Sequence, residues 1–118
     1  MSGNSHQLAQ QIRHVLAHLI RAAVMADEQH AAAERREALR MHEALRLAAD
    51  PAALAAIRLD GLWTAAIGDA ETPDLHREPV QVSTTLPASC PLTLDELVEP
   101  GLKLAELEAR IRDAASTG

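Results

Sequence analysis

The sequence has no phenylalanine and no tyrosine, and its single tryptophan, Trp63, is its only aromatic residue. Hydrophobic residues make up 47% of the chain, which is enough for a core, but alanine supplies much of that share. Because alanine buries little apolar area, each such residue adds little hydrophobic stabilisation at about 25 cal/mol per Å². The predicted core is therefore thin, and contact with a second copy or with another protein is a natural way to stabilise it.

The chain also lacks long apolar runs, a second cysteine and an excess of basic residues. A single cysteine excludes an internal disulfide framework, and no run approaches the roughly twenty apolar residues of a spanning helix. The first residues, MSGNSHQ, lack the basic and then apolar pattern of a signal peptide. A net charge of −6 argues against binding to nucleic acid or to anionic membranes. We therefore expect a cytoplasmic protein with no membrane or nucleic-acid partner, and the alanine, arginine and leucine bias favours a bacterium.

Glycine and proline are absent from residues 4–50, so this stretch is predicted to be helical throughout. A first helix capped by Asn4 or Ser5 carries one apolar stripe at helical spacing. The stripe consists of Leu8, Ile12, Val15, Leu16, Leu19 and Ile20, and the opposite side carries Gln7, Gln11, His14, His18 and Arg21.

One rod over residues 5–49 would be about 65–70 Å long, which is too long for a compact domain of this size. Asp27 offers a new N-cap, so we predict a helical hairpin with a break near residues 25–29. The single long helix remains the alternative. The second helix, about 29–49, carries charges that predict a solvated face, namely Glu34, Arg35, Arg36, Glu37, Arg40 and Glu43.

The segment Pro51 to Ile67, PAALAAIRLDGLWTAAI, is apolar almost all the way round a helical wheel. Asp50 stands at the N-cap position and Pro51 at the first helical position, where proline is well tolerated. A helix that is apolar on every side is normally buried by its neighbours. We therefore predict that this segment is the central helix, that Trp63 lies in the core, and that Gly68 ends the helix.

Residues 70–92 contain four prolines and are predicted to form an irregular connector. Thr93 and Glu96 have the spacing of a capping box, which begins a short helix that Pro100 and Gly101 end. A terminal helix follows within residues 102–118. Its apolar stripe, Leu104, Leu107 and Ile111, is expected either to fold back onto the first helix or to form the interface of a homodimer.

The segment LPASCPLTLDELVEPGL, residues 86–102, contains a Pro-x-x-Cys-Pro pattern followed by a hydroxyl residue, a leucine-bearing turn and an acidic end. Two further segments add to this pattern: residues 15–21, VLAHLIR, and the start of the predicted central helix, Asp50-Pro51-Ala52-Ala53-Leu54. Together they resemble the bacterial family known as domain of unknown function family twenty-nine, of which this chain would be a truncated or divergent member. The resemblance implies an all-α fold, and it supplies no catalytic residues.

The first helix carries one pair of potential metal ligands. His14 and His18 lie one turn apart on one face, the spacing at which two imidazoles can share a metal ion. In an antiparallel hairpin they would face residues 36–42, where Glu37 or His42 could supply a third ligand. The competing interpretation is that both are solvated, or that His18 bonds across the hairpin.

Cys90 precedes a helix start, where a thiolate can become reactive, but no basic residue lies near it in sequence. A small apolar plug under the Pro87–Pro91 loop is the favoured interpretation. No phosphate-binding loop or nucleophile elbow occurs, so we predict no catalytic residues and no cofactor.

The sequence therefore predicts a single helical domain over residues 1–118. Its fold is an all-α bundle with an N-terminal hairpin, a buried central helix and short C-terminal helices. The predicted function is that of a non-enzymatic interaction or assembly module that forms a homo-oligomer or binds a protein partner. A metal-binding protein using His14 and His18 is the alternative, and a nucleic-acid-associated regulator is a weaker one.

Overall fold

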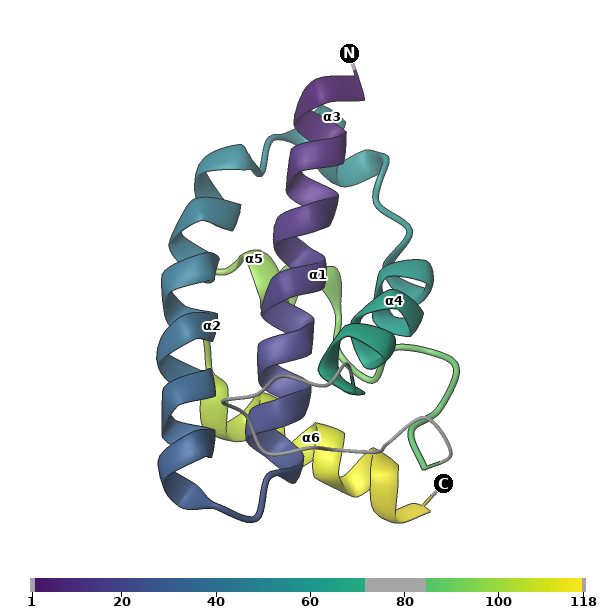
Figure 1. Ribbon diagram of the computed structural model, residues 1–118. Helices are drawn as coiled ribbons and strands as arrows, with labels where there is room; N and C mark the ends of the chain where they lie inside the picture. Colours follow the sequence, from purple (N-terminus) through teal and green to yellow (C-terminus); the bar gives the residue numbers. More distant parts are fainter. Residues whose placement is uncertain (1, 72–84, 118) are drawn as a thin grey trace.

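The computed structural model describes residues 2–71 and 85–117, which form helices joined by turns and contain no strand. The helices are α1 (Ser2–Val24), α2 (Glu28–Ala48), α3 (Pro51–Ala55), α4 (Leu59–Glu71), α5 (Leu94–Val98) and α6 (Leu104–Thr117). Figure 1 shows them as one bundle, which confirms the predicted all-α fold. Within these ranges, no helix has the length and apolar character needed to cross a membrane.

The predicted helical hairpin is confirmed, and the long single helix is excluded. Asp27 is the N-cap of α2, since its carboxylate accepts hydrogen bonds from the backbone N–H of Gln29 at 2.8 Å and of His30 at 3.3 Å. The start of α1 differs from the prediction. The helix already runs through Asn4 and Ser5, so neither residue is its cap.

The central helix of the bundle is α1, and not the segment 51–67. α1 lies between α2 and α4 and contacts α2, α3, α4 and α6 (Figure 1). It is buried on more than its predicted stripe because alanines flank that stripe and allow neighbouring helices to approach closely. Its buried residues are Leu8, Ile12, Val15, Leu16, Ala17, Leu19, Ile20, Arg21, Ala22 and Ala23. The predicted placement of a central helix at 51–67 is therefore wrong.

Residues 51–67 do not form one helix but are divided between α3 and α4. Asp50 caps α3 as predicted, because its carboxylate accepts a hydrogen bond of 2.9 Å from the backbone N–H of Ala53. The helix then tightens and ends, since the N–H groups of Ala56 and Ile57 bond carbonyl oxygens three residues earlier. The break lets α4 take its own direction against α1.

The second part of this segment, α4, extends past Gly68 to Glu71, so Gly68 does not end the helix. Consequently the predicted connector over 70–92 is wrong at its first two residues, which are helical. Residues 72–84 lie outside the described ranges, and residues 85–92 contain no helix, as expected. Trp63 is fully buried on α4, which confirms its predicted place in the core.

The C-terminal helices pack back onto the hairpin. The capping box is confirmed, with the backbone N–H of Glu96 bonding the Thr93 hydroxyl at 3.2 Å and the Thr93 N–H bonding the Glu96 carboxylate at 3.0 Å. Gly101 has a φ of 86°, a conformation that glycine adopts without strain, and it turns the chain into α6. α6 lies against α1 and buries Leu107 and Ile111. The stripe therefore folds back onto the first helix, which is one of its two predicted outcomes, and a homodimer to which the terminal helix contributes stays a prediction.

Candidate functional site

Three ionisable side chains meet where α1 packs on α2. The Nδ1 atom of His18 lies 2.7 Å from Oε1 of Glu34, and Nε of Arg21 donates to Oε2 of Glu34 at 3.4 Å. Nη1 of Arg21 also donates a hydrogen bond of 2.5 Å to the carbonyl oxygen of Ala70 on α4. The side chains of Arg21 and Glu34 are only 3% and 6% exposed.

This buried ion network explains how two polar faces pack together. The Asp27 cap fixes the hairpin turn, which brings Glu34 on α2 opposite His18 and Arg21 on α1. Buried charges are costly unless they are paired and hydrogen-bonded. Both oxygens of the Glu34 carboxylate have protein partners, so the network is a structural tie between α1, α2 and α4. The prediction that Glu34 lies on a solvated face is wrong.

The two predicted metal ligands occupy different environments. His14 is exposed on α1, whereas His18 bonds Glu34 across the hairpin. The predicted third ligands do not join them, because Glu37 pairs with Arg40 at 2.6 Å and His42 is buried farther along α2. Residues 2–71 and 85–117 hold no group of three His, Cys, Asp or Glu that could hold a metal ion. Metal binding by His14 and His18 stays a prediction.

His42 is the buried residue whose chemistry the sequence does not reveal. It is 4% exposed, and its Nε2 atom has no hydrogen-bond partner within the described part of the chain. Burial, and then the charge of Arg46, lowers the pKa of His42. Hydrogen bonds with the backbone of Glu99, the C-cap of α5, and of Leu97, and then the charge of Glu43, oppose that shift. His42 therefore packs as a neutral side chain of α2 against α5.

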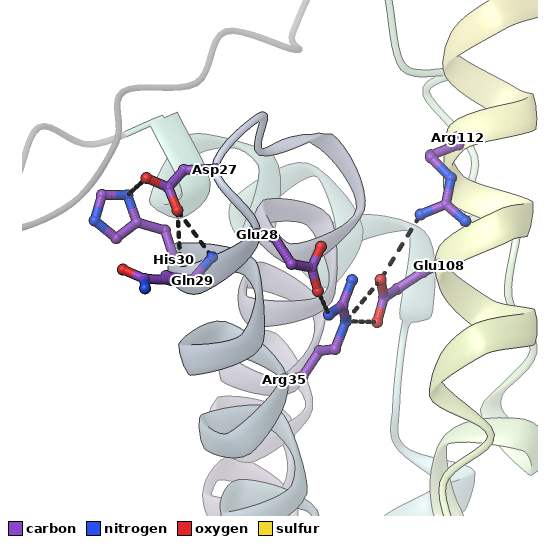
Figure 2. A network of polar contacts seen from close by, with 7 residues as sticks. All are labelled: Asp27, Glu28, Gln29, His30, Arg35, Glu108 and Arg112. Carbon is purple, nitrogen blue, oxygen red and sulfur yellow. Dashed lines mark hydrogen bonds and ion pairs between the residues drawn. The ribbon is translucent and has the colours of Figure 1, made fainter.

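A second network joins α2 to α6 (Figure 2). Nε of Arg35 donates to both carboxylate oxygens of Glu108, at 3.1 and 2.9 Å, and Nη1 of Arg35 donates to Glu28 at 2.5 Å. Arg112 lies 3.7 Å from the same Glu108 carboxylate, which is 3% exposed. The hydrogen bonds to Glu108 and then Glu28 raise the pKa of Arg35, so this residue stays charged. The network fixes α6 against the hairpin.

Cys90 lies half-buried in the loop before α5 and is held by α4. Its backbone N–H donates a hydrogen bond of 3.0 Å to the carboxylate of Asp60. Burial raises the pKa of the Cys90 thiol to about 11, so the sulfur is a protonated thiol at neutral pH. A thiol in this state is a poor nucleophile, which favours the predicted role of an apolar plug.

The outer face of α2 is the one helix face with large, exposed apolar side chains among the described residues. The side chain of Leu47 is 91% exposed and that of Leu39 is 43% exposed. Figure 1 shows α2 at one edge of the bundle, with α1 on its inner side. Exposed charged side chains surround the leucines, namely Arg36, Arg40, Glu43 and Arg46. A hollow of about 240 Å³ is lined by Glu43, Arg46 and Leu47. Sequence reasoning missed this face because it assigned the charged residues of α2 to a solvated face and gave Leu39 and Leu47 no role.

Two further hollows lie elsewhere on the surface. The hollow of about 360 Å³ lies between α4 and the loop before α5, and the hollow of about 290 Å³ lies between the start of α1 and the α3–α4 junction. The first is lined by Thr64, Ile67, Gly68, Glu71, Leu86, Pro87 and Ala88, and the second by Ser5, Ala9, Ala56, Ile57, Arg58, Gly61 and Leu62. The lining residues of each hollow include a single ionisable side chain, Glu71 in the first and Arg58 in the second, whereas acid–base catalysis normally uses a pair.

Comparison with known proteins identifies no relative, since no family model, no curated protein and no solved structure matches the chain. The resemblance of residues 86–102 to domain of unknown function family twenty-nine stays a prediction.

Proposed function

We propose that this chain is a non-enzymatic interaction module that associates with protein through the outer face of α2. The observation that carries the proposal is the 91% exposure of Leu47 at the C-terminal end of that face. Burying a leucine side chain contributes about 1.5–3 kcal/mol relative to leaving it in water. Leu47 therefore offers stabilisation that the chain itself does not use.

The surroundings of Leu47 resemble the anatomy of an interface. Leu39 lies two helical turns before Leu47 on the same helix, and arginine and glutamate side chains surround both leucines. Exposed apolar side chains among arginines are typical of protein interfaces. The hollow beside Leu47 gives this face a concave part into which a partner side chain can fit.

Several buried polar groups have a role in the fold, which supports the same proposal. Glu34 joins three helices, Glu108 joins α6 to α2, and the Cys90 thiol is protonated. The proposed setting is the bacterial cytoplasm, which rests on the single cysteine and the alanine-rich composition.

The test compares Leu47→Glu with the control Ala105→Glu, which places the same charge at an exposed position of α6. Light scattering from about 10 µM to about 1 mM covers the range of weak complexes. Capture of proteins from a bacterial extract with the immobilised chain reports other partners. Association that Leu47→Glu abolishes and Ala105→Glu retains supports the proposal. Absence of both self-association and Leu47-dependent capture, with circular dichroism showing intact folds, would overturn it.

A further inference from the structure

Four exposed residues form a stripe along the outer face of α2. Arg36, Arg40, Glu43 and Leu47 recur at alternating spacings of four and three residues, which places them on one side of the helix. This spacing is that of the seam along which two helices pack side by side. The stripe spans roughly 16–18 Å of helix at 1.5 Å per residue, which is enough for one short helix-to-helix contact.

We infer that a second copy of the chain occupies this face, with its α2 antiparallel to the first so that Arg40 of each copy meets Glu43 of the other. The inference rests on the proposed function and names its partner. In this register a twofold axis passes between the two helices, so one patch serves both copies. The same axis brings Leu47 of each copy against Arg36 of the other.

Charge complementarity selects this arrangement. An antiparallel pair in this register makes two contacts of opposite charge between Arg40 and Glu43. A parallel pair in register would instead bring Arg40 against Arg40 and Glu43 against Glu43, and such like charges repel. The existing ion pair of Arg40 with Glu37 does not compete strongly, because both side chains are exposed, at 73% and 40%.

The apolar parts of the stripe also find partners in this register. The aliphatic stem of Arg36 covers Leu47 of the other copy and keeps its guanidinium in water, as long basic side chains do. The hollow lined by Glu43, Arg46 and Leu47 lies where Arg40 of the second copy arrives. A seam of four residues is small compared with the roughly 800 Å² per partner of standard interfaces, so the dimer is weak and forms at high micromolar concentration.

The test uses charge reversal at the two paired positions. Arg40→Glu and Glu43→Arg each turn both contacts of the homodimer into like-charge pairs, so each variant dimerises at least about tenfold more weakly. An equimolar mixture of the two variants restores opposite charges at both contacts. The mixture therefore associates as tightly as the parent, to within about threefold, although neither variant does so alone. The double variant Arg40→Glu/Glu43→Arg recovers dimerisation in the same way.

Sedimentation velocity with one variant fluorescently labelled measures the mixed dimer, and circular dichroism confirms that each variant is folded. Single variants that dimerise like the parent, or a mixture that is no better than its components, would overturn the inferred register. A parent chain that stays monomeric to about 1 mM would overturn the second copy as the partner. In that outcome, Leu47-dependent capture of another protein would leave the proposed function intact, whereas its absence would overturn both.

Discussion

The indole Nε1 of Trp63 donates a hydrogen bond of 2.9 Å to the carbonyl oxygen of Pro87, which ties α4 to the loop before α5. The ring, which is the only aromatic side chain of the sequence, is fully buried. Its hydrogen bond joins residues that are 24 positions apart in the sequence. A buried indole N–H normally needs such a partner. Trp63 is therefore the largest side chain of the core, and its hydrogen bond also holds the loop before α5 against α4.

Replacement of Trp63 tests these two roles separately. Trp63→Ala removes both bulk and hydrogen bond and should lower the free energy of unfolding by about 3–5 kcal/mol. Trp63→Phe keeps most of the bulk and leaves the Pro87 carbonyl without its donor, so a loss of about 1–3 kcal/mol is expected. Urea unfolding followed by circular dichroism measures both. Equal losses for the two variants would show that packing bulk is not what Trp63 contributes.

The acid stability of the C-terminal helices should depend on Glu96. The Arg110 guanidinium, 2.5 Å from the Glu96 carboxylate, and then the Thr93 N–H lower the pKa of Glu96 from 4.5 to about 2. Because the folded state holds this pKa below the unfolded value, the contribution to stability is complete above about pH 4.5 and is lost as the pH falls toward 2. Urea unfolding at pH 6 and pH 3 should therefore show a smaller acid loss in Glu96→Gln than in the parent. Asp95→Asn, at an exposed position of the same helix, is the control and should keep the parent's acid loss.

The sequence predicted those features whose causes lie within a few residues of chain. Asp27 begins α2, Asp50 begins α3, and Thr93 with Glu96 begins α5, because each cap depends on side chain and backbone only two or three residues apart. The hairpin follows from the first of these caps and from the length limit on a single rod.

The features that the sequence did not predict depend on contacts between distant segments. Residues 51–67 were predicted to form the central helix because apolar residues surround a helical wheel of this segment. The alanines of this segment bury little area, however, and the helix that contacts four others is α1. Glu34 looked like its charged neighbours, because only the hairpin geometry brings it to His18 and Arg21. The exposure of Leu47 could not be predicted either, because it depends on which side of α2 packs against α1.

Mild acid should destabilise the contact between α2 and α5 through His42. Burial and Arg46 lower the pKa of His42 below its ordinary value of 6.5. Protonation of His42 is therefore harder in the folded state than in the unfolded state. The contribution of neutral His42 to the free energy of unfolding is complete above about pH 6.5 and is lost as the pH falls through the lowered pKa of the folded state. Unfolding measured at pH 7 and pH 5 should show a smaller loss for His42→Leu than for the parent. His14→Leu, at an exposed position of α1, is the control and should keep the parent's loss. Identical pH dependence in parent and His42→Leu would show that His42 does not titrate in this range.

The last prediction concerns the ion network between α1, α2 and α4. Glu34→Ala removes the Glu34 carboxylate from the buried Arg21 guanidinium and should cost about 3–5 kcal/mol, as does the breaking of other buried ion pairs. Removing both charges with Arg21→Met and Glu34→Leu should cost clearly less than Glu34→Ala alone, because apolar side chains of similar size can replace a buried ion pair with little loss. The exposed pair of Arg40 and Glu37 is the control, and Glu37→Ala should change the free energy of unfolding by no more than about 1 kcal/mol. Urea unfolding of the four proteins decides the matter. A double variant less stable than Glu34→Ala would show that contacts of Arg21 other than its pairing with Glu34, such as its hydrogen bond to the Ala70 carbonyl, contribute more to stability.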